Sequence, residues 1–173
     1  MLKFAVTGPE STGKTELCRQ LAAHFHCEWE PEIAREYVEH LERPYTYEDV
    51  CRIAELQTEQ EKKYEGMKEN EFVFFDTELI VTKVWFEFKY GVVPEFVTNR
   101  LAVRFFDFYL LCLPDIPWVY DPVREHESER NLLFDWYEKE IVSLGTDYAK
   151  IGGLGEERLK NALQAVKIFD TSR

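Results

Sequence analysis

The stretch that decides the fold of this 173-residue chain is Gly8-Pro9-Glu10-Ser11-Thr12-Gly13-Lys14-Thr15. It matches the pattern G-x-x-x-x-G-K-[ST] in full. The apolar run Leu2–Thr7 comes before it and predicts a buried strand that ends at a Gly-Pro turn. After it, one face of a helix is marked by Leu17, Cys18, Leu21, Ala22 and Phe25. Strand, glycine-bearing loop and helix in this order are the setting in which the pattern binds phosphate.

Each residue type in this loop has a physical role. Gly8 and Gly13 permit the backbone conformations that turn successive N–H groups inward and form a nest for an anion. Lys14 is expected to reach the β- and γ-phosphates, and the Thr15 hydroxyl to bind Mg²⁺. The alternative, a glycine-rich turn that only caps a helix, does not require Lys-Thr at its end. We therefore predict ATP and Mg²⁺ as cofactors, with nucleotide contacts from Gly8, Glu10, Ser11, Thr12, Gly13, Lys14 and Thr15.

The rest of the chain alternates strands and helices. Continuous apolar runs such as Phe72–Phe75 and Phe108–Leu113 predict strands that are covered on both faces, as in a parallel sheet. The pattern predicts an α/β fold of three layers, a central parallel sheet flanked by helices, in a single domain over residues 1–173. Further strands are expected near Cys27–Glu30 and at 147–151, and helices at 33–42, at 47–70 and from Glu156 onward.

Composition limits the partners. The formal net charge is −12, and an acidic chain repels nucleic-acid backbones, so we expect no nucleic-acid partner. The longest apolar stretch is far below the roughly 20 residues that span a bilayer. No secretory signal and no CxxC pair are recognised, and the four cysteines are expected to be reduced thiols. We therefore expect a cytoplasmic protein with no membrane contact; its oligomeric state stays open.

Asp76 ends the run Phe-Val-Phe-Phe-Asp, where a phosphate-loop protein needs a carboxylate near Mg²⁺. We expect it to be a metal or catalytic residue. Its alternative role is that of a helix N-cap, which both Asp76 and Thr77 suit. The two roles are compatible.

A phosphate loop binds nucleotide but does not name the reaction. A GTPase requires a guanine-reading NKxD motif and a DxxG switch, and neither occurs in the chain. An oligomeric or motor ATPase usually needs a longer chain. A small-molecule kinase therefore leads, and a nucleotide-sensing regulatory ATPase module is the alternative from another class.

A kinase also needs a base for the acceptor hydroxyl and cations over the transferring phosphoryl group. Glu32 and Arg35 are three residues apart on an expected helix, so they share a face, with Tyr37 close by. Either Glu32 or Asp76 is the expected base, although Glu32 and Arg35 could equally form a pair that only stabilises the helix. The segment 114–131, with three prolines and the run REHESER, is a candidate lid. It supplies Arg124 and Arg130 for the phosphates, unless they pair with neighbouring glutamates.

Three aromatic residues are candidates for holding a flat acceptor. Trp85 and Tyr90 follow Asp76, and Trp118 lies in the approach to the lid. A flat heteroaromatic ring, above all a cationic one, binds well between such side chains. Burial in the core is the safer assumption for any one of them.

Four motifs in this order resemble the ribosylnicotinamide (nicotinamide riboside) kinase domain of the NadR-type proteins: GPESTGKT, EIAREY, DTELIVTKVWFEFKYG and PDIPWVYDPVRE. The likeness runs over nearly the whole chain. It implies a kinase fold that uses Mg-ATP to phosphorylate the 5′-hydroxyl of nicotinamide riboside, which gives nicotinamide mononucleotide for NAD synthesis or salvage.

The resemblance also implies residue roles. Trp85 and Trp118 would shape the base pocket, Asp121 and Arg124 belong to the lid motif, and Gly153 and Arg158 lie where an adenine-binding loop is expected. The chain is expected to have no room for the DNA-binding or adenylyltransferase domains of the longer members. Their activities are therefore not carried over, and another nucleoside is the alternative acceptor.

Overall fold

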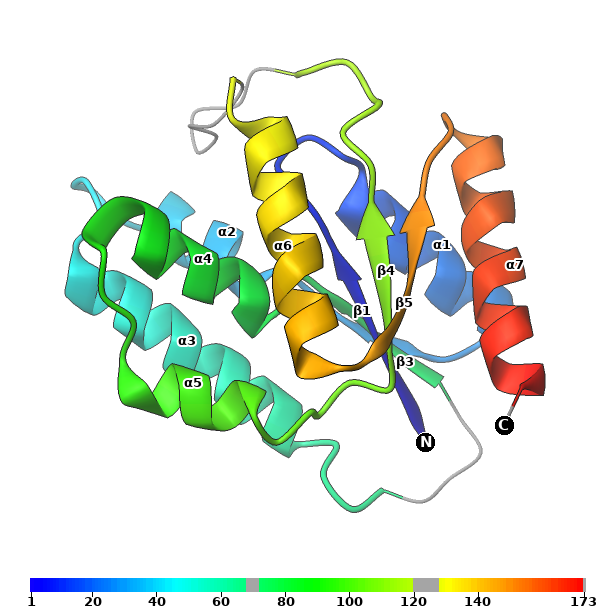
Figure 1. Cartoon of the computed structure of the whole chain (residues 1–173), viewed down its shortest axis with the longest axis horizontal. Helices are drawn as coiled ribbons and strands as arrows, with labels where there is room; N and C mark the ends of the chain where they lie inside the picture. Colours follow the sequence, from blue (N-terminus) through cyan, green and yellow to red (C-terminus); the bar gives the residue numbers. More distant parts are fainter. Residues whose placement is uncertain (68–71, 120–127, 173) are drawn as a thin grey trace.

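The computed structural model describes residues 1–67, 72–119 and 128–172 (Figure 1). Five strands and seven helices occur in these ranges. In chain order they are β1 (Leu2–Thr7), α1 (Lys14–Phe25), β2 (Glu28–Glu30), α2 (Ile33–Glu39), α3 (Tyr47–Lys62), β3 (Phe72–Asp76), α4 (Leu79–Tyr90), α5 (Glu95–Leu101), β4 (Phe108–Cys112), α6 (Arg130–Leu144), β5 (Asp147–Ile151) and α7 (Glu156–Thr171).

The five strands form one parallel sheet in the order β2-β3-β1-β4-β5. From β1 the chain first builds β2 and β3 on one side of the sheet. It then returns to add β4 and β5 on the other side, so the strand order reverses next to β1. Ligands of such sheets bind at the carboxyl ends of the strands at this point. The carboxyl ends lie at the upper edge in Figure 1, and the N-terminus lies at the lower edge.

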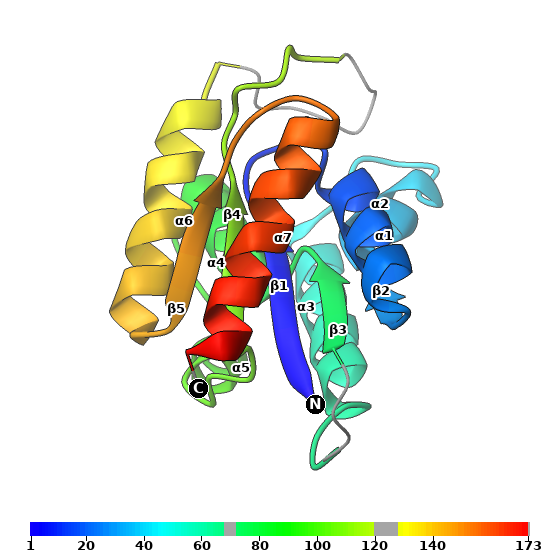
Figure 2. The same cartoon turned by 90° about the vertical axis from the view of Figure 1, so that its right-hand side faces the viewer.

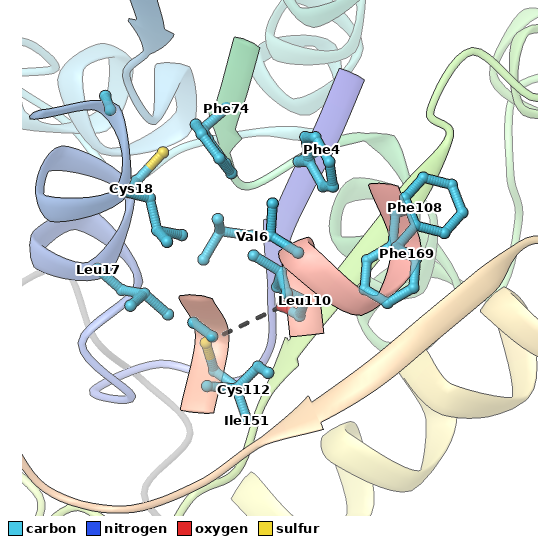
Figure 3. Close-up of a cluster of buried hydrophobic side chains, with 14 residues drawn as sticks. Phe4, Val6, Leu17, Cys18, Phe74, Phe108, Leu110, Cys112, Ile151 and Phe169 are labelled. Atoms are coloured by element: carbon cyan, nitrogen blue, oxygen red, sulfur yellow. Dashed lines mark hydrogen bonds between the residues drawn. The ribbon is translucent and has the colours of Figure 1, made fainter. Parts of the chain in front are cut away.

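Strand residues alternate between the two faces of the sheet. Phe4 and Val6 of β1 face α1 and α7, where they pack with Phe74, Leu110 and other buried side chains (Figure 3). Ala5, between them, faces α4 and α6 on the other side. Both faces are apolar because helices cover both of them, which is the reason for the continuous apolar runs in β3 and β4. The predicted three-layer α/β fold is confirmed.

A second helical layer extends one side of the molecule. Helices α3, α4 and α5 gather at the left of Figure 1 and share a smaller core around Val50, Leu79, Phe86 and Val97. Figure 2, turned by 90°, shows α1 and α7 on the side of the sheet that faces away from α6. No described helix is long and apolar enough to cross a bilayer.

Two helices are shorter than the sequence predicts. α2 ends at Glu39, whereas a helix over 33–42 was expected, and α3 ends at Lys62, whereas one over 47–70 was expected. Beyond α3 the chain turns at Gly66, whose φ is +74°. Tyr64 still packs in the core after the helix ends, but residues 65–67 are exposed, so no packing stabilises a longer helix there.

The predicted cap of α4 is wrong. Asp76 is still part of β3, opposite Val6 of β1, and Thr77 has a φ of +68°. The N-cap is Glu78, whose carboxylate accepts a hydrogen bond from the Ile80 N–H at 2.7 Å. Sequence preference favours Asp and Thr as caps. However, Asp76 is still paired in the strand and Thr77 has a positive φ, so the helix begins after both residues.

Candidate active site

The phosphate loop follows β1 directly and wraps the start of α1. Gly8 has a φ of +139°, and a Cβ there would lie 2.7 Å from the Cys112 carbonyl oxygen at the end of β4. Gly13 and Ser11 also have positive φ values, of +74° and +55°. Glycine at position 8 is therefore required by both conformation and space. Within the described residues no side chain caps the first turn of α1, so its N–H groups face the loop.

Side chains of the loop fold over its own backbone. The Thr12 hydroxyl donates to the Pro9 carbonyl at 2.8 Å, and the Lys14 ammonium donates to the same oxygen at 2.9 Å. Lys14 therefore reaches across the mouth of the loop. An ammonium at this place, beside the positive end of a helix, provides a site for polyphosphate.

Asp76 lies beneath the loop and is 1% exposed. Its Oδ1 accepts from the Thr77 hydroxyl at 3.3 Å, whereas its Oδ2 is buried without a hydrogen-bond partner among the described residues. Burial raises the pKa of Asp76, and the nearby Lys14 and the Thr15 hydroxyl oppose that shift. An orphaned carboxylate oxygen beside a threonine hydroxyl suits a hard cation such as Mg²⁺.

No cage of three or more His, Cys, Asp or Glu side chains exists in the described ranges. Mg²⁺ in nucleotide sites commonly uses one or two protein oxygens and completes its shell with water and phosphate. The pair of Thr15 and Asp76 is therefore sufficient for the expected metal.

A cavity of about 360 Å³ opens from the loop toward α2 and α4. Its lining combines three groups of residues: the phosphate loop with Gly8 and residues 10–16; Glu32, Ala34, Arg35, Val38 and Tyr45; and Thr77, Val81, Thr82, Trp85, Phe88, Leu133 and Tyr137. One continuous cavity thus has phosphate-binding groups at one end and aromatic and apolar walls at the other.

Glu32 and Arg35 line the same cavity, and the charge of Lys14 acts on Glu32. Glu32 is the residue at the N-cap position of α2, and its Oε2 is 3.9 Å from the Arg35 Nε. Burial raises the pKa of Glu32, against the opposing charges of Lys14 and Arg35. Arg35 also pairs with Glu39 at 3.1 Å. A carboxyl group with a raised pKa in a cleft next to a phosphate-binding lysine is a candidate general base.

Tyr37, predicted near the substrate, lies on another face of α2. Its hydroxyl donates to Asp49 Oδ1 at 3.2 Å, and Asp49 also binds Arg43 at 2.6 Å. These contacts join α2 to the start of α3. A direct contact of Tyr37 with substrate stays a prediction.

The aromatic wall of the cavity is built by Trp85 together with Tyr45. The two rings meet edge to face at 4.8 Å and 76°, and the Trp85 indole N–H donates to the Tyr45 hydroxyl at 3.2 Å. The Lys89 ammonium lies 3.8 Å from the centre of the Tyr45 ring. Trp85 was singled out from the sequence. Tyr45 was missed, because it stands in a Pro-Tyr-Thr turn 40 residues upstream and carries no pattern of its own.

Tyr90 and Trp118 lie outside this wall. Tyr90 packs edge to face against Tyr47 at 5.2 Å and contacts Phe86 in the core of the second helical layer. Trp118 lies 5.8 Å from the Arg130 guanidinium. Roles for both residues in substrate binding stay predictions.

Arg130 is the first residue of α6 and reaches back to the phosphate loop. Its guanidinium donates to the carbonyls of Ser11 and Ile116, each at 3.0 Å. Ser11 in turn accepts from the Val119 N–H at 3.1 Å. The first part of the candidate lid, 114–119, is thus attached to the loop. Asp121 and Arg124 lie outside the described residues.

Arg158 and Gly153 form a separate structure near the end of β5. Arg158 is 4% exposed and donates to the carbonyls of Leu113, Ile151 and Gly153, besides its ion pair with Asp115. The Gly153 N–H donates to Asp115 Oδ2 at 2.8 Å. These contacts hold the β5–α7 loop against the end of β4. A nucleotide contact from either residue stays a prediction.

Several solved structures share this architecture. A NadR protein in complex with NR is similar over 97% of this chain and 51% of its own, with a TM-score of 0.77 and 24% identity. The thymidylate kinase from Ehrlichia chaffeensis matches with a TM-score of 0.69 and 11% identity, over 96% of this chain and 97% of its own. A deoxyadenosine kinase from M. mycoides matches with a TM-score of 0.66 and 13% identity, over 96% of this chain and 99% of its own.

These likenesses establish the fold, since all three identities are below 25%. The chain spans about half the length of the NadR structures that it matches. No curated protein sequence matches it closely enough to count as a relative. A family model described as an AAA domain matches residues 3–158, which hold the phosphate loop, all five strands and the walls of the cavity. The chain therefore belongs to that AAA domain family.

Proposed function

We propose that this chain is an ATP-dependent kinase that transfers the γ-phosphoryl group to the 5′-hydroxyl of a nucleoside, with nicotinamide riboside as the first candidate. The observation that carries this proposal is one cavity whose lining contains the phosphate loop, Glu32 and the Tyr45–Trp85 wall. A protein that only binds nucleotide needs the first part. A transferase needs both parts and a carboxylate at the junction.

At the donor end, the loop amides and Lys14 would hold the triphosphate in one orientation. Lys14 would leave the Pro9 carbonyl for phosphate oxygens, a charge-assisted contact that is stronger than the neutral acceptor it replaces. Thr15 and Asp76 would hold Mg²⁺, which supplies neutralisation of charge on the β- and γ-phosphates. Arg130, already in contact with the loop, and Arg124 would add positive charge at the transferring group.

At the acceptor end, Glu32 would take the proton of the 5′-hydroxyl. Between the two expected bases it is favoured because it lines the cavity, whereas Asp76 is buried beneath the loop beside Thr15. Arg35 would orient Glu32 or bind phosphate. Phosphoryl transfer requires little covalent chemistry from the protein, so holding the hydroxyl in line with the γ-phosphorus provides most of the acceleration.

Support for nicotinamide riboside comes from two sources. The motifs that resemble the ribosylnicotinamide kinase domain include Trp85, which lies in the cavity wall. In addition, the NadR structure with the highest similarity among those described above is a complex with NR. The electron-rich face of Trp85 suits a cationic pyridinium ring. Another nucleoside is the alternative, since a deoxyadenosine kinase shares the fold.

The direct test is ADP formation by the purified protein with Mg-ATP and a panel of nucleosides: nicotinamide riboside, adenosine, thymidine and cytidine. The proposal expects ADP only when a nucleoside is present, with nicotinamide riboside giving the highest kcat/KM, and the nucleoside 5′-phosphate as the second product. If adenosine or a pyrimidine nucleoside gave the highest kcat/KM, the proposed acceptor would be wrong but the proposed kinase reaction would stand. ADP formation that ignores every nucleoside would defeat the kinase assignment and favour a nucleotide sensor.

A further inference from the structure

A buried carboxyl group, whose pKa is raised by burial to about 8, joins the two ends of the cavity. Glu78 is 2% exposed and lies between β3 and α4. Its Oε1 accepts from the Thr7 hydroxyl at 3.1 Å, and its Oε2 accepts from the Ile80 N–H at 2.7 Å. Thr7 is itself fully buried. One side chain therefore bonds to the last residue of β1 and to the first turn of α4.

The two bonds connect the donor and acceptor parts of the site. Thr7 immediately precedes Gly8, where the phosphate loop begins. Helix α4 carries Val81, Thr82 and Trp85 into the cavity wall. The position of the loop relative to this wall fixes the distance between a bound phosphate and a bound acceptor.

The backbone beside Glu78 is strained. Thr77 is a β-branched residue with a φ of +68°, and its N–H donates to the Val6 carbonyl at 3.0 Å. A conformation of this kind persists only where the surrounding structure imposes it, and such residues cluster at functional sites. Here the β1 backbone holds one side of Thr77, and Glu78 holds the other. Thr77 itself lines the cavity.

The choice of residue is unusual for a cap alone. A short Ser, Thr, Asp or Asn side chain is the common N-cap, and burial of a carboxylate is unfavourable unless hydrogen bonds satisfy it. Glu78 is longer than a cap requires, and the additional length reaches Thr7. The bond to Thr7 is thus the feature that a simple cap does not explain.

We propose that Glu78 is a positioning residue, which holds the phosphate loop and helix α4 at the spacing needed for in-line transfer. This inference rests on the proposed kinase function. Glu78 acts through the Thr7 hydroxyl and the first turn of α4 and touches neither substrate. Its loss should therefore reduce turnover while each substrate still binds.

The primary test is Thr7→Val, which keeps the shape of the side chain and removes only the hydroxyl that Glu78 accepts, with Thr7→Ser as the matched control. Glu78→Ser is the second variant, because it keeps a good N-cap residue but is too short to bridge to Thr7. We expect Thr7→Val and Glu78→Ser each to lower kcat by about 10- to 100-fold, as displacement of reacting groups by an ångström does. The KM values for ATP and nucleoside should stay within about twofold, and Thr7→Ser should recover most of kcat. The double variant should be no slower than Glu78→Ser alone, because both substitutions remove the same hydrogen bond between Thr7 and Glu78.

A purely structural role gives a different result. If both variants melt earlier but keep the wild-type kcat well below their melting temperatures, or if Thr7→Ser is as slow as Thr7→Val, the positioning role is wrong. Failure of the kinase proposal itself is recognised earlier, because the wild-type protein would then form no nucleoside-dependent ADP. Hydrogen exchange tests the connection even in that case. Thr7→Val should speed exchange both at residues 8–15 and at the Ile80 amide, and unchanged exchange at either place would refute it.

Discussion

The two ends of the cavity, which we propose hold the phosphate donor and the acceptor, are built in opposite ways. The donor end is a loop of eight consecutive residues, and its binding groups are mainly backbone N–H groups held by Gly8 and Gly13. The acceptor wall joins Glu32 and Arg35 of α2, Tyr45 of the following turn and Trp85 of α4, and its binding groups are side chains. A backbone site depends on local conformation and tolerates change elsewhere. A side-chain site can take a new ligand by substitution without altering the fold.

This contrast explains how related folds serve different acceptors. The solved structures that resemble the chain include a NadR protein, a thymidylate kinase and a deoxyadenosine kinase. Their fold is shared down to 11% identity. If function follows the same division here, donor variants should abolish the reaction with every acceptor, whereas acceptor variants should change its preference.

The largest effect is expected at the donor end. Lys14→Ala should lower kcat by roughly a thousandfold with every nucleoside, because it removes the ammonium aimed at the developing phosphate charge. Initial rates at saturating ATP would measure this, and circular dichroism would confirm that the fold is kept. Lys14→Arg is the control for charge without the correct geometry. A Lys14→Ala protein as active as wild type would remove the phosphate loop from the mechanism.

The next effect tests the junction of the two ends. Glu32→Gln should lower kcat by roughly a hundredfold, within the range of a lost general base. A base works only when ionised, and burial raises the pKa of Glu32. The rate of the wild-type enzyme should therefore fall as the pH drops through a pKa above the ordinary Glu value of about 4.3. This acidic limb should vanish in Glu32→Gln, and its persistence would transfer the role to another group such as Asp76.

A smaller effect is expected at the acceptor wall. Trp85→Ala should raise the KM for the nucleoside about tenfold, the typical worth of one base–aromatic stack, with the KM for ATP nearly unchanged. Trp85→Phe keeps a ring and serves as the matched control. Steady-state kinetics with each substrate varied in turn would separate the two KM values. Equal increases in both would show that Trp85 supports the fold and does not contact the acceptor.

The smallest effect concerns the support of that wall. Tyr45 directly precedes the N-cap of α3, where the Thr46 hydroxyl and the Asp49 carboxylate form a capping box. Thr46→Ala should lower the free energy of unfolding by about 1 kcal/mol, measured by urea denaturation. Thr46→Ser should be nearly neutral. ATP affinity should not change in either variant, because the donor end does not depend on this turn.

The Asp49 carboxylate of this capping box should also contribute to the stability of the protein at low pH. The Arg43 guanidinium and the Thr46 N–H hold the pKa of Asp49 well below its usual range. A carboxyl group with a depressed folded pKa stabilises the protein above its unfolded pKa of about 3.9 and loses that contribution as the pH falls further. Asp49→Asn should therefore flatten the loss of stability below pH 4. If Asp49→Asn loses stability below pH 4 as the wild-type protein does, other carboxylates cause that loss.

Elements with a strong local signal were predicted well. Strands β1 and β3 agree with the apolar runs that predicted them, and β5 occupies the predicted residues 147–151. The signal failed where it was only charge, as in the overlong helix predicted over 47–70. It failed again at the α4 cap, because strand register and the positive φ of Thr77 shifted the cap to Glu78. Arg158 donates to the carbonyls of Leu113, Ile151 and Gly153, and its contact with adenine stays a prediction.

The sequence by itself determined the phosphate loop and the covered parallel sheet. Both follow from local rules: glycine conformations and helix-end amides in the first case, and unbroken apolar runs in the second. Only the tertiary structure decided that Tyr45 joins Trp85, that Glu32 faces the cavity while Tyr37 turns to Asp49, and that Glu78 bonds to Thr7. These partners lie up to 71 residues apart. Their meeting depends on how helices dock on the sheet, and no short stretch of sequence encodes that arrangement.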